Sequence, residues 1–213
     1  EEYKEMHKAI SRDCITLVKY KDRDVLPITP ERYKRIMIVH VKGAESGMGM
    51  LMKAMGMGGG KNPAEMLKER LCEKGFDAFI YESPLDAMKK QIAAGEKPNI
   101  NLYFAGKNAI DDFVSGMDLV ITLCDVSSGR PSFGLSKGGG EIPWYVHELP
   151  VIVIGCGQPF VLADIPQART YINTYDSADQ TFDALIEKLM SGSDAFIGED
   201  PVDAYCGLWD THR

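Results

Sequence analysis

The chain is poor in the patterns from which many catalytic and metal sites are built. Its five cysteines are widely spaced and its four histidines lie far apart, so neither C-x-x-C nor H-E-x-x-H occurs. The sequence therefore gives little support to a metal site or a disulfide framework, and no cofactor is expected. Cys124 and Cys156 end apolar segments and are interpreted as small buried hydrophobic residues. A reducing, cytoplasmic setting is expected, with secretion as the alternative if an upstream signal is missing.

Excess positive charge and long hydrophobic runs are also lacking. The formal net charge is −7, whereas nucleic acids and anionic membranes favour clustered Lys and Arg, so neither is expected as a partner. No run approaches the roughly 18 apolar residues of a membrane-spanning helix. Hydrophobic residues still make up 45% of the 213 residues, which is enough for a sizeable core.

Phosphate-binding motifs fail in detail. The segment 56–60, Gly-Met-Gly-Gly-Gly, is followed by Lys61 and resembles a Walker loop. That motif, however, needs Gly where Met55 stands and Ser or Thr where Asn62 stands. The dinucleotide fingerprint G-x-G-x-x-G is not satisfied either. The Gly- and Met-rich segment 43–60 is instead interpreted as a loop that adapts to a neighbouring surface.

Short apolar runs alternate with helical segments of about a dozen residues. Strands are expected at 36–41, 76–81, 118–124, 151–154 and 170–175, and helices at 3–13, 63–74, 84–95 and 181–190. This alternation predicts an α/β fold with a doubly wound, mostly parallel sheet and helices on both faces, a flavodoxin-like three-layer sandwich. Asn62 before Pro63 predicts one helix start, and Ser177 with Gln180 predicts a capping box at another.

Ligands and partners of such a sheet gather at the carboxyl ends of its strands. The two longest expected loops, 42–60 and 125–140, fall on that edge. No nucleophile–base set is recognisable, so no catalytic residue is assigned. The candidates for a substrate rim or a domain interface there are Asp125, Ser128, Arg130 and Glu141.

Several segments, in order and spacing, resemble the C-terminal α/β-sandwich domain of glycoside hydrolase family 3, of the β-N-acetylglucosaminidase-like group. Residues 9–19 and 25–28 are similar to the family's inter-domain connection, and residues 34–39 are similar to its first sheet strand. Its late strands are matched by residues 150–154, 158–162 and 171–175, and its closing helix is matched by residues 184–190. The resemblance implies three parts. These are an inter-domain arm at 1–33, the sandwich at 34–192 and a tail at 193–213 that packs on the domain or its partner.

The resemblance also implies a larger N-terminal partner, a TIM-type barrel with the aspartate nucleophile. A chain of 213 residues holds one sandwich and no barrel. β-Glucosidase-like members of the family place a glutamate acid/base in the loop that matches 125–140, and this loop has no Glu before Glu141. The β-N-acetylglucosaminidase-like members keep a His/Asp pair in the barrel. The expectation is therefore a non-catalytic domain of a β-N-acetylhexosaminidase, inactive alone, with the carbohydrate substrate at the inter-domain edge.

Two alternatives remain at this stage. One is a free-standing flavodoxin-like domain that binds a small ligand at the same edge. The other is a hydrolase complete in itself, in which Asp125 and Glu141 are the first carboxylates to consider.

Overall fold

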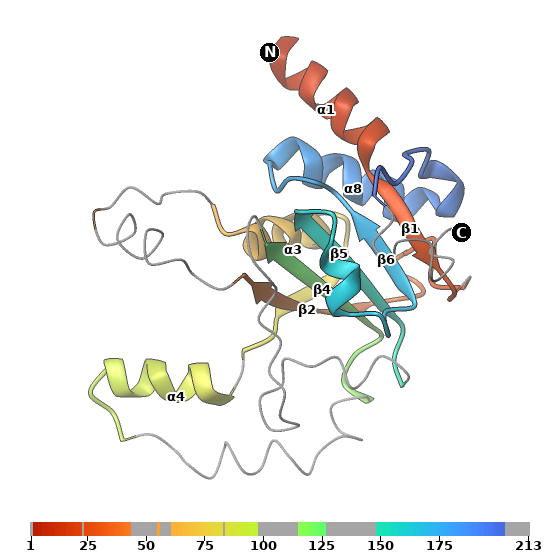
Figure 1. Cartoon of the computed structure of the whole chain (residues 1–213). Helices are drawn as coiled ribbons and strands as arrows, with labels where there is room; N and C mark the ends of the chain where they lie inside the picture. The colour runs from red at the N-terminus through yellow and green to blue at the C-terminus, as the bar shows by residue number, and fades with distance from the viewer. Residues whose placement is uncertain are drawn as a thin grey trace.

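A computed structural model of the chain describes residues 2–22, 24–43, 55, 61–82, 84–97, 115–126 and 148–202 (Figure 1). Its strands are β1 (Thr16–Tyr20), β2 (Arg35–Lys42), β3 (Asp77–Ile80), β4 (Leu119–Val126), β5 (Val151–Gly157) and β6 (Thr170–Asn173). They form one six-stranded sheet in the order β1-β6-β5-β4-β2-β3. All neighbouring pairs are parallel except β1 with β6, so the prediction of a mostly parallel α/β sheet is confirmed.

The central strands are apolar on both faces because helices cover the sheet. β4 is the clearest case, since seven of its eight residues are buried and it pairs with β2 on one side and β5 on the other. Val120 stands opposite Val151, and Ile36 stands opposite Leu119. Continuous apolar runs of this kind are typical of parallel strands inside an α/β fold.

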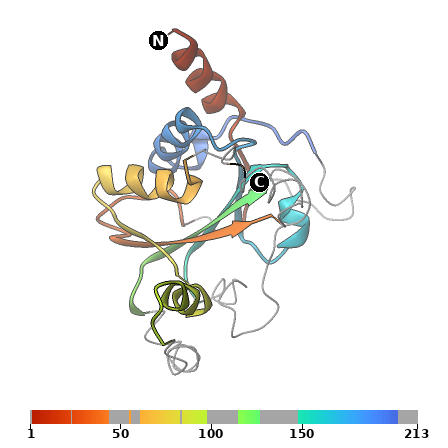
Figure 2. The ribbon, with the colours of Figure 1, turned by 90° about the vertical axis from the view of Figure 1, so that its left-hand side faces the viewer.

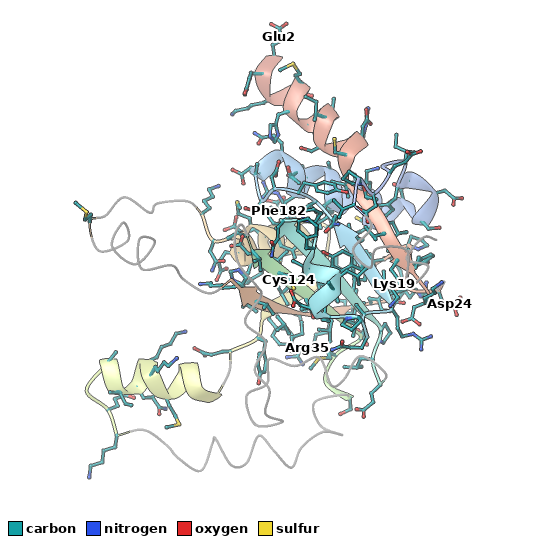
Figure 3. All side chains as sticks on the ribbon, viewed as in Figure 1. Glu2, Lys19, Asp24, Arg35, Cys124 and Phe182 are labelled. Carbon is teal, nitrogen blue, oxygen red and sulfur yellow. The ribbon has the colours of Figure 1, made fainter. Side chains whose placement is uncertain are left out.

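One face of the sheet is covered by α3 (Pro63–Glu73) and α8 (Asp179–Ser191), and α1 (Glu2–Cys14) packs beside α8. The larger core lies here, with Phe182 fully buried between α8 and the sheet (Figure 3). Apolar positions of α8 recur at helical spacing, as the sequence predicts. They are Phe182, Leu185, Ile186 and Leu189.

The opposite face carries a smaller core. The short helix α7 (Val161–Asp164) packs Val161 and Leu162 here, against a cluster that includes Tyr171. In the two perpendicular views, α4 (Pro84–Ala93) stands apart from the sheet (Figures 1 and 2).

The two predicted helix starts have different outcomes. Asn62 caps α3 as expected, because its side chain accepts a hydrogen bond from the Ala64 amide at 3.1 Å. The predicted capping box of Ser177 and Gln180 is wrong, since α8 starts after Ala178 without a side-chain cap from that residue. Asp176 instead holds the chain at the start of α8, because its Oδ1 accepts from the amide of the N-cap residue Ala178 at 2.9 Å and from the Thr181 hydroxyl.

Both ends of the described chain meet at β1. Residues 16–20 lie within the predicted arm, and they join the sheet as an antiparallel edge strand beside β6. After α8 and the 3-10 turn η2 (Ser193–Ala195), the chain passes β1 so closely that a side chain at Gly198 would meet Thr16 and the Cys14 carbonyl within 3 Å. The first and last described segments therefore lie against each other.

Candidate functional site

The candidate site is the carboxyl edge of the sheet, where β2, β4, β5 and β6 end and the antiparallel β1 begins. Of the four predicted rim residues, the structure places Asp125, one residue before the end of β4. Ser128, Arg130 and Glu141 lie outside the described residues, as does most of the Gly- and Met-rich segment 43–60. The described part of this edge is therefore built from strand ends and the turns that follow them.

Asp125 faces a histidine that the sequence does not connect with it. His40 on β2 directs Nε2 toward Asp125 Oδ2 at 3.7 Å. The His40 side chain is 9% exposed and the Asp125 side chain 31%, so the imidazole lies beneath the carboxylate. The distance exceeds that of a hydrogen bond, and His40 Nε2 has no hydrogen-bond partner within the described ranges. The pair thus presents one solvent-accessible carboxylate and one buried imidazole nitrogen to which no described residue is hydrogen-bonded.

Next to this pair, the end of β5 is closed by tight packing. The Tyr171 hydroxyl donates to Asn173 Oδ1 at 2.7 Å, and both side chains are buried. A Cβ at Gly155 would lie 2.3 Å from that hydroxyl, so only glycine fits at this point of β5. The space between the ends of β5 and β6 is filled by protein and leaves no room for a ligand at this position.

A second set of polar contacts, partly buried, continues from β5 to α1. The Thr174 hydroxyl lies 2.8 Å from the Asp176 carbonyl oxygen, to which it donates, and 3.4 Å from Cys156 Sγ. Asp176 in turn lies close to α1, with Oδ2 3.8 Å from His7 Nε2. We call Cys156, Thr174, Asp176, Thr181 and His7 the edge network. It ties α1 to the end of β6 and the start of α8.

The edge network does not provide a thiol nucleophile. Burial raises the pKa of the Cys156 thiol to about 12, and the nearby Asp125 and Asp176 act in the same direction. A thiol must lose its proton to attack a substrate or bind a metal, and this one stays protonated at neutral pH. In the described ranges no three His, Cys, Asp or Glu side chains gather as a metal site requires. The described helices include none long and apolar enough to span a membrane.

Exposed apolar side chains accompany this edge. Tyr3, Met6 and Ile10 form a stripe along α1 at helical spacing and are 75%, 52% and 55% exposed. We call these three residues the α1 stripe. The helix projects beyond the sheet, with Glu2 near its outer tip (Figure 3). Phe160, which follows β5, and Ile197, which precedes Gly198, are also more than half exposed. Exposed apolar side chains next to polar groups are typical of surfaces that contact another protein or domain.

Comparison with known proteins connects this domain with sugar-cleaving enzymes. No protein-family model matches the chain. A β-N-acetylglucosaminidase/β-glucosidase from Cellulomonas fimi is 31% identical over 214 residues, which are 97% of this chain and 34% of that protein. The structure of β-glucoside phosphorylase BglX superposes with a TM-score of 0.71 and 27% identity, over 100% of this chain and 33% of that one.

A more distant structure shares the fold. The glycoside hydrolase family 3 β-N-acetylglucosaminidase from Paenibacillus sp. str. FPU-7 superposes with a TM-score of 0.53 and 15% identity, over 91% of this chain and 32% of that one. The chain spans about a third of the length of each of these relatives. The chain is accordingly a domain related to glycoside hydrolase family 3, homologous to one part of the Cellulomonas fimi enzyme and of BglX.

Proposed function

We propose that the chain is the C-terminal, non-catalytic domain of a family 3 glycoside hydrolase, in which an N-terminal TIM-type barrel carries the catalytic residues. The observation that carries this proposal is the asymmetry of coverage. The match to the Cellulomonas fimi enzyme takes in 97% of this chain but 34% of that protein. Residues 1–33 then form the inter-domain arm, 34–192 the sandwich domain and 193–213 the tail.

The α1 stripe and the carboxyl edge support docking of the barrel at this side of the domain. Three large apolar residues stay exposed on α1 although the opposite side of that helix is anchored through His7, Lys8 and Ser11. Contact of such apolar surface with water is unfavourable, and its burial against a partner lowers the free energy. In this proposal the barrel contacts the α1 stripe and lies over the ends of β4 and β5.

The proposed substrate is a β-linked N-acetylhexosaminide. The relatives carry three activity names, namely β-N-acetylglucosaminidase, β-glucosidase and β-glucoside phosphorylase. The absence of a glutamate from residues 125–140 favours the first, because the acid/base of β-glucosidase-like members is expected in that loop. Asp125, Ser128, Arg130 and Glu141 remain the proposed rim residues, and the His40–Asp125 pair gives the rim one position with two polar groups.

The test compares the 213-residue chain with the complete gene product that contains it. Both are assayed with chromogenic β-N-acetylglucosaminide and β-glucoside, each with and without inorganic phosphate. We expect cleavage of the N-acetylglucosaminide by the longer protein and none by the chain alone. Preference for the glucoside, or a requirement for phosphate, would overturn the substrate assignment. Turnover by the chain alone would overturn the non-catalytic role and make Asp125 and Glu141 the first residues to replace.

The rim assignment has its own test in the longer protein. Arg130→Ala is expected to raise KM for the N-acetylglucosaminide while the melting temperature stays unchanged, because Arg130 is proposed to contact substrate. Lys68→Ala, a change on the exposed surface of α3, is the matched control. Unchanged kinetics in Arg130→Ala would remove this residue from the rim.

A further inference from the structure

A hollow of about 380 Å³ opens at the amino edge of the sheet, opposite the candidate site. It lies where β1 ends and where β5 and β6 begin, and its walls include Asp22, Pro150 and Arg169 from these junctions. Asp24, in the turn after β1, marks its position in Figure 3. Small-molecule sites usually occupy roughly 300–1,000 Å³, so the hollow has the size of a small ligand.

The lining combines hydrogen-bond donors and acceptors. Asp22 and Arg169 form an ion pair with Oδ1 and Nε 2.5 Å apart, so a carboxylate and a guanidinium lie side by side in the wall. Asp24, Arg32 and Glu148 also line the hollow, and these three make no ion pair with any described residue. The lining therefore holds three acidic and two basic side chains, with much of their hydrogen-bonding capacity unused.

The inner part of the hollow is more apolar. Val25 and Leu149 are buried residues that line the hollow, and Tyr33, which also lines it, is 6% exposed. The Tyr33 hydroxyl has no hydrogen-bond partner among the described residues, and burial raises its pKa, so it is a neutral donor and acceptor. The ring of Tyr33 is held in place by the Arg32 guanidinium, which lies 4.9 Å from its centroid. A hydroxyl that lines a hollow and has no partner among the described residues can bond a ligand hydroxyl without giving up a protein partner.

The combination of these groups selects a class of ligand. A phosphate or carboxylate ligand would meet one more acidic than basic side chain, and a polycation would meet Arg32 and Arg169. A neutral polyol avoids both conflicts, because each hydroxyl donates to a carboxylate and accepts from a guanidinium. Adjacent ring hydroxyls can contact Asp22 and Arg169 together, while the C–H face of the ring lies against Val25 and Leu149.

We infer that this amino-edge hollow is a binding site for a neutral sugar, separate from the rim proposed at the carboxyl edge. The two places lie at opposite ends of the same strands, since Arg169 precedes β6 and Asn173 ends it. A sugar bound here holds a carbohydrate chain against the domain without approaching the rim. The inference concerns the chain itself and does not depend on the barrel or on turnover.

The test is an NMR titration of the 15N-labelled 213-residue chain with N-acetyl-D-glucosamine and D-glucose. Inorganic phosphate and spermidine serve as probes that carry charge without a sugar ring. Saturable shifts of the Val25, Tyr33 and Leu149 amides by a sugar are expected. Glu148→Gln and Asp24→Asn keep the side-chain shape but remove a charged acceptor, and each is expected to weaken sugar binding roughly tenfold.

Glu65→Gln, which removes an exposed carboxylate on α3 away from the hollow, is the control and should leave the affinity unchanged. Shifts confined to Gly157 and its neighbours at the other edge would overturn the location. Shifts caused equally by phosphate or spermidine would overturn the ligand class, and no shift with either sugar would overturn the site. None of these outcomes bears on the activity of the longer protein, so the inference fails or stands separately from the proposed function.

Discussion

The two edges of the sheet are built differently, although the same strands supply both. At the carboxyl edge, Tyr171 and Asn173 bond to each other and the edge network links β5, β6 and α1. At the amino edge, Asp24 and Glu148 remain unpaired with described residues around an open hollow. At the described carboxyl edge the polar side chains are therefore mostly bonded to one another. At the amino edge, in contrast, charged side chains remain available for a ligand.

The closest packing at the carboxyl edge gives the largest expected effect. In Gly155→Ala the new methyl group would lie 2.3 Å from the Tyr171 hydroxyl and 2.9 Å from Asn173 Oδ1. Tyr171 is fully buried and cannot move aside, so we expect a loss of about 3 kcal/mol in the free energy of unfolding, measured by urea denaturation.

Tyr171→Phe tests whether that hydroxyl causes the clash. Alone, this change removes the hydrogen bond to Asn173 and should cost about 1 kcal/mol. Combined with Gly155→Ala, it removes the nearest clashing atom, so the double variant should lose less stability than the sum of the two single variants. Simple additivity would mean that the Tyr171 ring or the Asn173 side chain, and not the hydroxyl, limits the space at Gly155.

High pH should lower the free energy of unfolding, in part through groups buried at the carboxyl edge. The unfolded chain releases the Cys156 proton near the ordinary pKa of 9.0, whereas the folded chain holds that proton up to a pKa of about 12. Between these values the unfolded state binds fewer protons, so the free energy of unfolding should fall as pH rises from about 9 to about 12.

Urea denaturation across this pH range measures the slope. Burial of the Tyr171 phenol raises its pKa as well and contributes in the same direction. Cys156→Ala should reduce the slope, and Cys14→Ala, which removes an exposed thiol, should leave it unchanged. Equal slopes in both variants would show that burial of Cys156 does not control alkaline stability.

Two threonines at opposite ends of β6 make a matched pair. The Thr174 hydroxyl donates to the Asp176 carbonyl oxygen, so Thr174→Val should cost about 1–2 kcal/mol in the free energy of unfolding. The Thr170 hydroxyl is buried without a partner in the described part of the chain, so Thr170→Val should be neutral or stabilising by up to about 1 kcal/mol. Equal losses in the two variants would contradict the difference between the edges.

The smallest effect on the chain alone is expected for the α1 stripe. Tyr3, Met6 and Ile10 are more than half exposed, so their joint replacement by Gln should change the free energy of unfolding by about 0.5 kcal/mol or less. In the longer protein the same replacement should lower the temperature of thermal inactivation, because the proposed barrel contact is lost. Unchanged inactivation there would remove the α1 stripe from the proposed interface.

The sequence predicts the sheet well because its signals are local. The runs at 36–41, 118–124 and 151–154 all lie in observed parallel strands, and the Asn62–Pro63 start of α3 is confirmed by the cap hydrogen bond. Periodicity and capping act over a few residues and can be read without knowledge of the fold.

The contents of the two edges depend on contacts between distant segments, which periodicity does not report. Asp125 was predicted at the carboxyl edge, but no pattern in the sequence connects it with His40. Asp176 replaces the predicted capping box because its carboxylate reaches both Ala178 and Thr181. The hollow could not be predicted, since Asp22 and Arg169 come together only when β1 pairs antiparallel with β6.

The pairing of β1 with β6 also bears on how the nascent chain reaches its fold. A ribosome delivers α1 and β1 before the other described elements of this domain, yet Thr16 pairs with Asn173 and α1 packs on α8. Until nearly the whole domain has emerged, β1 has no neighbouring strand, and contacts between such distant segments form slowly because a long loop must close. Gly198 fits against Thr16 later still. Within the described domain, the elements that are synthesised earliest are thus among the last to be secured, and truncation before α8 leaves α1 without the helix on which it packs.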